Sequence, residues 1–132
     1  GPDFVTQKII SGLRAISDGL QSTLALGNTT IARDWLWADD VADALHSIGS
    51  SSKSSDYVVA SGITSTLDAF TAIACEQFGL EPNEVITHEP GLRRPLEIQS
   101  VRLNPAKVQQ DFGWKPSVSF QEIVERLISR EV

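Results

Sequence analysis

Hydrophobic residues recur at intervals of three and four along several stretches of the chain, a spacing typical of helices with one buried face. The first stretch predicts a helix from about Thr6 to Asp18, ended by Gly19. Its apolar positions are Val5, Ile9, Ile10, Leu13, Ile16 and Leu20. The same spacing predicts four further helices, over about residues 40–48, 66–78, 105–111 and 120–128. The expected buried positions of the first of these four are Val41, Ala42, Leu45 and Ile48.

Residues that favour helix N-termini precede these patterns, because their side chains satisfy backbone N–H groups that the helix leaves unbonded. The expected caps are Asp39 or Asp40, Ser65 with Asp68, Asn104 before Pro105, and Ser119 with Glu122.

Short runs of β-branched and aromatic residues predict strands between the helices. Residues 23–26 and 31–37 flank the turn at 27–30 and together predict a strand, turn, strand element. The run Tyr57–Ala60 is short and apolar, as in a buried strand of a parallel sheet, and weaker candidates cover 85–87 and 98–103. We therefore expect one compact unit of helices and strands, without internal repeats.

Composition narrows the class of protein. The 132 residues are 41% hydrophobic and 21% charged, as in an ordinary globular domain. A net charge of −6 argues against binding to nucleic acid or to an acidic membrane surface. The single cysteine, Cys75, excludes an intrachain disulfide and should be a small buried side chain. With no apolar run as long as a membrane span, we expect a cytoplasmic protein.

The first two residues, Gly1-Pro2, are interpreted as a cloning remnant, because the chain contains no methionine and a helix pattern follows at once. The natural protein is expected to be longer than these 132 residues.

The search for catalytic chemistry gives mostly negative results. The sequence has no glycine-rich phosphate loop and no cysteine/histidine metal constellation. His46 is expected on a helix surface, whereas His88 either lines a pocket or ends a solvated strand. The acids Asp39, Asp40 and Asp43 suit a helix N-terminus better than a metal or acid/base cluster.

Two arginines are the strongest candidates for ligand binding. Arg94 lies beside a proline in the loop 89–97, and Glu97 follows three residues later. A guanidinium so placed suits a diphosphate and the acid suits sugar hydroxyls. Arg33, in a predicted strand, could complete a nucleotide-sugar clamp; the alternative is an ion pair with Asp34 or Asp39.

Other candidates are weaker on residue chemistry alone. Lys8 precedes Ile9 on the first helix and is expected to face solvent. Trp35, Trp37 and Trp114 could stack on a base, although their strand and turn settings favour core packing for at least two of them.

Several motifs resemble one known family in their order and spacing. They are Phe4-Val5-Thr6-Gln7-Lys8-Ile9, Leu26-Gly27-Asn28, Arg33-Asp34-Trp35, 56–62, Arg94-Pro95-Leu96-Glu97-Ile98 and Phe112-Gly113-Trp114-Lys115-Pro116. The chain after Pro2 resembles the C-terminal half of GDP-mannose 4,6-dehydratases, which are extended short-chain dehydrogenases/reductases.

The resemblance implies an α/β fold in which residues 3–132 form a substrate-binding domain whose strands complete a Rossmann sheet. It implies that the nucleotide sugar binds to Val5, Lys8, Arg33, Arg94 and Glu97, with the arginines on the diphosphate and Glu97 on a ribose hydroxyl. The catalytic Tyr and Lys and the NADP site would lie mainly in an N-terminal Rossmann half. No catalytic residue, metal or bound cofactor is therefore expected on this chain alone, which should be inactive by itself.

Together with that half, the resemblance implies a homo-oligomeric lyase that converts GDP-mannose to GDP-4-keto-6-deoxymannose. Departures from the family pattern, among them a large Trp37 near the Arg33 strand, keep another nucleotide sugar open. The alternatives are a related epimerase or reductase, or a non-catalytic interaction module on the same scaffold.

Overall fold

The structure, a computed structural model, describes residues 4–92 and 97–129 and confirms the predicted α/β class. In that part, the helices are α1 (Val5–Ser17), α2 (Ala38–Gly49), α3 (Leu67–Gln77), α4 (Pro82–Val85), the 3₁₀ turn η1 (Pro90–Leu92), α5 (Ala106–Phe112) and α6 (Phe120–Ser129). The strands are β1 (Leu24–Leu26), β2 (Ala32–Asp34), β3 (Thr64–Thr66) and β4 (Ile86–His88).

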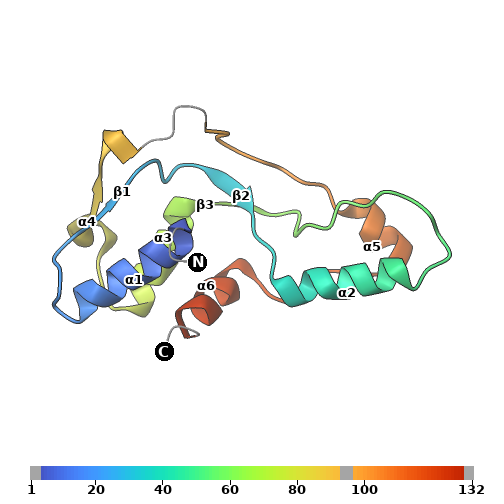
Figure 1. Ribbon diagram of the computed structural model, residues 1–132, viewed down its shortest axis with the longest axis horizontal. Coiled ribbons are helices and arrows are strands. Elements are labelled where there is room, and N and C mark those ends of the chain that lie inside the picture. The colour runs from blue at the N-terminus through green and yellow to red at the C-terminus, as the bar shows by residue number, and fades with distance from the viewer. Residues whose placement is uncertain (1–3, 93–96, 130–132) are drawn as a thin grey trace.

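The molecule is elongated, and its elements gather at two ends (Figure 1). One end holds α1, β1, α3, α4 and α6, whereas the other holds α2 and α5. The buried side chains form three separate clusters. The expectation of one compact unit is therefore wrong, because extended segments around β2 and β3 connect two packed ends.

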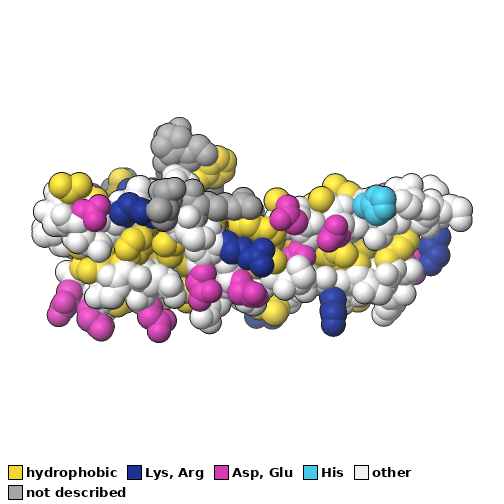
Figure 2. Space-filling view, turned by 90° about the horizontal axis from the view of Figure 1, so that it is seen from below, with side chains coloured by type: hydrophobic (Ala, Val, Ile, Leu, Met, Phe, Trp, Pro, Cys, Tyr) yellow, Lys and Arg dark blue, Asp and Glu magenta, His cyan; other side chains and the backbone are white. Residues whose placement is uncertain are grey.

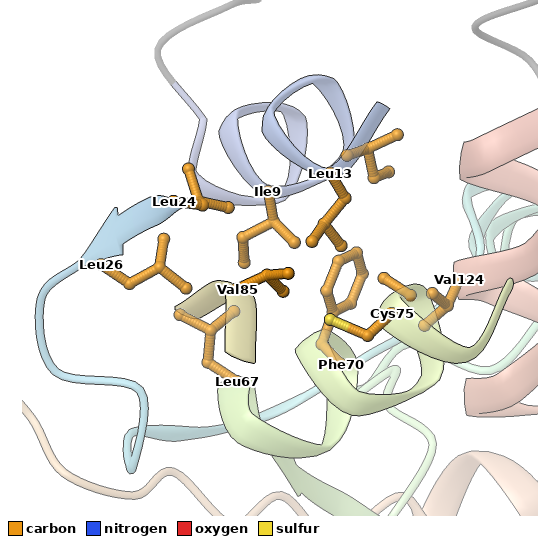
Figure 3. Close-up of a cluster of buried hydrophobic side chains, with 11 residues drawn as sticks. Ile9, Leu13, Leu24, Leu26, Leu67, Phe70, Cys75, Val85 and Val124 are labelled. Atoms are coloured by element: carbon orange, nitrogen blue, oxygen red, sulfur yellow. The ribbon is translucent and has the colours of Figure 1, made fainter. Parts of the chain in front are cut away.

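The largest cluster lies between α1, α3, β1 and α6. Ile9, Leu13 and Phe70 are fully buried there, as the helical spacing predicted (Figure 3). Cys75 is also fully buried, which confirms its expected packing role, and burial raises the pKa of its thiol. Leu20, in contrast, is 79% exposed, because it follows the end of α1 and leaves the helical face.

The strands form two separate pairs. β1 pairs in parallel with β4, and β2 pairs antiparallel with β3. The predicted strand, turn, strand element is confirmed as β1, the turn after it and β2, but these two strands do not pair with each other. The turn does not close a hairpin, because the carbonyl oxygens of Thr29 and Ile31 accept hydrogen bonds from the N–H groups of Asp68 and Leu67 at the start of α3.

Two further strand predictions are wrong. Residues 57–60 are extended coil, in which the ring of Tyr57 packs against Phe112 of α5 at 5.2 Å between centroids. Residues 98–103 make one isolated bridge, between Ala32 and Ser100, instead of a strand. The backbone of residues 99–101 bonds to Ala32 of β2 through two hydrogen bonds, which is too short a pairing to count as a strand.

The second end is built around Ala44, Val108 and Trp114. Ala44 is fully buried, whereas Leu45, which the pattern placed in the core, is 59% exposed. Ala44 and Leu45 differ because α2 packs on α5 through the side that carries Ala44, and Leu45 lies outside this contact. Figure 2 shows hydrophobic side chains reaching the surface along one face of the molecule, between scattered charged groups.

The helix caps follow the sequence only in part. Ser119 and Glu122 form the predicted capping box before α6: the Ser119 N–H donates to Glu122 at 2.8 Å and the Glu122 N–H to Ser119 Oγ at 3.3 Å. Thr66, not Ser65, caps α3. Asn104 Oδ1 accepts the N–H of Ala106 at the start of α5, as expected.

The helix α2 has no side-chain cap, so that prediction is wrong. Its N-cap residue is Trp37, and both Asp39 and Asp40 lie inside the first turn. Asp40 is drawn away from the helix end because it accepts hydrogen bonds from the N–H and hydroxyl of Ser117 at 2.9 and 2.6 Å.

Across residues 4–92 and 97–129, no helix has the length and apolar character needed to cross a lipid bilayer.

Candidate functional site

A pocket of about 470 Å³ lies between the start of α1, the turn that follows β1, and β2. Residues from four segments far apart in the sequence line it. Four of the five predicted site residues are among them: Val5, Lys8, Arg33 and Glu97. The fifth, Arg94, lies outside the described residues.

Lys8 is exposed, as its position on α1 predicted, but its ammonium group is not free in solvent. The buried neighbours Ile9 and Ile10 fix the rotation of the helix so that Lys8 reaches over β1. Its Nζ donates a hydrogen bond to the carbonyl oxygen of Ala25 at 2.9 Å. An ammonium group carries further N–H donors, which remain available at the pocket edge.

Arg33 is half-buried in the middle of β2. Its Nη1 donates to the carbonyl oxygen of Ala32 at 2.8 Å, which holds the guanidinium against its own strand. Within the described chain the other guanidinium nitrogens of Arg33 have no protein acceptor, and the residue lines the pocket.

The ion-pair alternative for Arg33 is wrong for the described residues. Both carboxylate oxygens of Asp34 accept backbone N–H groups, from Ser61 and Gly62, at 2.8 Å. Asp39 accepts from Trp37 Nε1 at 3.0 Å instead. Among residues 4–92 and 97–129, the single ion pair joins Lys53 to Asp111.

Glu97 enters the same pocket from the far side of the turn. Its Oε2 accepts a hydrogen bond from Asn28 Nδ2 at 3.2 Å, and Asn28 Nδ2 also lies 3.4 Å from Gln99 Oε1. Sequence reasoning named Asn28 only as part of a family motif and did not predict it as a site residue, although an asparagine two residues before a threonine in a turn is a signal for a side chain that organises the backbone.

The rest of the lining is largely apolar. Phe4 and Leu92 are 69% and 46% exposed at the mouth, and Trp35 forms part of the wall. Trp35 also stacks on Phe70 at 5.4 Å between centroids, which ties the pocket to the main core. Flat apolar walls beside charged groups suit a ligand with a ring system and an anionic group.

Gly27 controls how closely η1 approaches the turn. A Cβ atom at Gly27 would lie 2.6 Å from the carbonyl oxygen of Leu92, closer than real Cβ atoms approach other atoms. Only a residue without a side chain lets these two backbone segments meet at the pocket mouth.

The other tryptophans are structural. Trp37 and Trp114 are 7% and 8% exposed, which confirms core packing for two of the three. Trp37 packs with Val118 and Ile123 and is not among the residues that line this pocket.

The two histidines are not among the residues that line the pocket, although His88 lies beside it. His88 is exposed with Nδ1 3.3 Å from the Gly27 carbonyl oxygen, which confirms the solvated strand end, and His46 is exposed on α2. No group of His, Cys, Asp and Glu side chains in the described ranges could hold a metal ion. The pocket is therefore suited to binding an anion beside a hydrogen-bond acceptor.

The chain is similar in sequence to known proteins. A family model described as GDP-mannose 4,6 dehydratase matches residues 1–127. GDP-mannose 4,6 dehydratases 2 and 1 of Arabidopsis thaliana are each 32% identical to the chain over its whole length. The chain spans only 35% and 37% of those two relatives, so it corresponds to about a third of their length.

Solved structures show the same fold at lower identity. RMD from Pseudomonas aeruginosa, complexed with NADPH, is 23% identical with a TM-score of 0.85; 98% of this chain aligns with 42% of that one. DesIV, a dTDP-glucose 4,6-dehydratase from Streptomyces venezuelae with NAD and TYD bound, is 21% identical with a TM-score of 0.76; the alignment covers 98% and 39%. The chain belongs to the GDP-mannose 4,6-dehydratase family and has the fold of extended short-chain dehydrogenases/reductases.

Proposed function

We propose that this pocket binds the nucleoside diphosphate part of a nucleotide sugar, with GDP-mannose as the ligand that family membership favours. The observation that carries the proposal is a pair of cations, Lys8 and Arg33, that line one pocket and form no ion pair within the described residues, although Glu97 lines the same pocket. The chain has 17 acidic residues and a net charge of −6, so two cations in one pocket differ from its overall charge. A diphosphate would supply the missing negative charge.

Each side chain has a distinct role in this proposal. Arg33 and Lys8 donate to the diphosphate, since each uses a backbone carbonyl to fix its position and keeps most of its N–H groups. Glu97 accepts a hydrogen bond from a ribose hydroxyl, and Val5 packs against the flat face of the base. Arg94 belongs to the proposed diphosphate site on sequence grounds alone.

The proposed working unit also contains a Rossmann half that covers part of this chain. The solvent-accessible surface is 8291 Å², whereas a compact monomer of this size exposes about 6,800 Å². Apolar residues on the surface include Leu45, Val58 and Ile63, at 59%, 46% and 67% exposure. Such a surface is suited to a large apolar interface. The relatives are longer than this chain, and their additional residues could form the domain that covers it.

The dinucleotide site is assigned to that partner half, because the described residues contain no glycine-rich turn of the kind that holds a pyrophosphate. A dinucleotide held there would supply hydride-transfer chemistry. The contribution of this chain is to hold the sugar nucleotide in place through its diphosphate and ribose while the reaction occurs. In the assembled protein the proposed reaction is conversion of GDP-mannose to its 4-keto-6-deoxy derivative.

The binding proposal is tested by titrating the chain with GDP, alone and in the presence of a Rossmann half. Arg33→Ala should weaken the affinity roughly tenfold or more, because a charge-assisted contact to phosphate is lost. Arg102→Ala is the matched control, since Arg102 is exposed and lies outside the pocket. Equal affinities for Arg33→Ala and the unaltered chain would overturn the proposal.

The reaction is tested separately, by analysing the products that the assembled protein forms from GDP-mannose and NADP. A 4-keto-6-deoxy sugar supports a dehydratase. An epimerised or reduced sugar would instead support the epimerase or reductase alternative, with the same binding site.

A further inference from the structure

The turn after β1 contains a side chain that touches both the pocket and the backbone beside it. Asn28 is half-buried, and its Nδ2 donates to Glu97 Oε2 at 3.2 Å. The same amide nitrogen lies 3.4 Å from Gln99 Oε1. Within the described chain no donor reaches the second carboxylate oxygen of Glu97, which lines the pocket.

The orientation of the Asn28 amide is fixed by its other end. Oδ1 accepts the N–H of Thr30 at 3.1 Å and the hydroxyl of Thr30 at 2.7 Å. Turning the amide over would place an oxygen against the Glu97 carboxylate and an NH₂ group against the Thr30 N–H. Both contacts would be repulsive, so the hydrogen-bond network defines which end faces Glu97.

The backbone on which Glu97 sits is held independently of Asn28. The carbonyl oxygen of Gln99 accepts the N–H of Ala32 at 2.7 Å, and the N–H of Val101 donates to the carbonyl oxygen of Ala32 at 3.1 Å. The main chain near Glu97 is therefore anchored to β2. What Asn28 controls is the direction of the Glu97 side chain.

We propose that Asn28 is a positioning residue that aims the Glu97 carboxylate at a pair of vicinal hydroxyls on the ligand, an inference that rests on the proposed nucleotide-sugar site. The amide satisfies one side of Oε2 and leaves the rest of the carboxylate to accept donors from the ligand. A ribose offers two adjacent donors of this kind, and a bidentate contact needs a carboxylate held at a defined angle. Asn28 thus makes the site selective for nucleotides with an intact diol.

The residue type matters because aspartate has the same shape. In Asn28→Asp, one oxygen can still accept both Thr30 donors and so keep the turn. The other oxygen replaces the NH₂ group and faces Glu97, where it repels the carboxylate instead of donating to it. This variant separates a role in positioning Glu97 from a role in folding the turn.

The experiment compares two probes, GDP and 2′,3′-dideoxy-GDP, titrated by NMR into the whole chain and its variants. The unaltered chain should bind GDP roughly tenfold more tightly than the dideoxy analogue, as the loss of charge-assisted hydrogen bonds implies. Asn28→Asp should bring this ratio to within about twofold of unity, as should Glu97→Gln. The ratio of the two affinities is the readout, because the added negative charge in Asn28→Asp weakens the binding of both nucleotides alike.

Asn83→Asp is the matched control, since Asn83 is exposed on α4 and lies outside the pocket, and it should keep the tenfold ratio. The Asn28→Asp variant should lose the side-chain NH₂ signals of Asn28. If the other signals of its spectrum are retained, the variant is folded.

An unchanged GDP preference in folded Asn28→Asp would overturn this inference and leave the diphosphate site standing. Equal binding of the two nucleotides by the unaltered chain would overturn it as well. No binding of either nucleotide would overturn the proposed function itself, and that result is seen before any variant is compared.

Discussion

Among the described residues, the main cluster at the end that contains α1, α3 and α6 has eleven buried side chains, whereas the cluster at the α2/α5 end has three. At the first end, Ile9, Leu13 and Phe70 are fully buried (Figure 3). At the second, Leu45 is 59% exposed and Val58 46% exposed. The second end is also held together by polar contacts. The hydroxyl of Tyr57 donates to Asp111 at 2.7 Å, and Lys53 forms an ion pair with Asp111 at 3.2 Å.

This difference in packing matches the two roles that we propose for the chain, which are ligand binding at the first end and docking onto a partner half at the second. The candidate pocket rests against the well-packed end, where Trp35 connects its wall to Phe70, and a rigid support keeps charged side chains at fixed distances. The α2/α5 end has apolar residues at the surface and a thin core of its own. It is suited to docking onto a partner half.

The largest expected effect is the loss of packing at the first end. Phe70→Ala should lower the free energy of unfolding by about 3–5 kcal/mol, because it removes a fully buried ring and leaves a cavity. Leu45→Ala, at the exposed position on α2, should cost less than about 1 kcal/mol. Urea denaturation measures both, and similar losses at the two sites would mean that the ends are equally well packed.

Asp40 tests whether polar contacts support the α2/α5 end. Burial alone would raise the pKa of Asp40, but hydrogen bonds from Ser117 and Val118 outweigh it and hold the pKa below its ordinary value of 3.8. Asp40→Ala leaves these donors unbonded and should cost about 1.5–3 kcal/mol at neutral pH.

The pH dependence of that loss has a defined direction. Since the folded-state pKa is depressed, the stabilisation by Asp40 is complete above the ordinary pKa and disappears as pH falls through the lower, folded-state value. The difference between Asp40→Ala and the unaltered chain should therefore shrink below about pH 4. Asp43→Ala, on an exposed position of α2, is the control; a constant difference across this range would exclude the ionised form of Asp40 as the cause.

Gly27→Ala should affect the pocket and not the cores. The added Cβ would meet the Leu92 carbonyl oxygen at 2.6 Å, so η1 must move away from the turn. We expect roughly tenfold weaker binding of GDP, with a smaller change in the urea midpoint. Gly91→Ala is a close control, because nothing lies within 4 Å of its added Cβ. Equal binding by both variants would show that the approach of η1 does not shape the site.

A smaller effect is expected at the start of α6. Ser119→Ala removes one half of the capping box and should cost about 1 kcal/mol in thermal or urea unfolding. Because α6 packs on the main core, the loss should appear in the same transition as that of Phe70→Ala. Two separate transitions would contradict a single cooperative unit at this end.

The sequence predicted best what depends on neighbouring residues. The helix α1 and the Ser119/Glu122 capping box were found because helical spacing and caps act over one or two turns. The strand expected at Tyr57–Ala60 was wrong because an apolar run does not say whether a partner strand exists.

The site was predictable only in part for the same reason. Arg33 was found by its residue chemistry, but Lys8 and Val5 entered through family resemblance. The role of Asn28 could not be seen, because its contact with Glu97 joins residues 69 positions apart and exists only in the folded chain.

The most direct test of the central claim is a ¹H–¹⁵N NMR titration of the chain with GDP. The account predicts that the signals of Lys8, Asn28, Arg33 and the Trp35 indole shift together with one saturation curve, while those of α2 and α5 stay in place. Shifts confined to α2 and α5, or saturation without any change at Arg33, would contradict it.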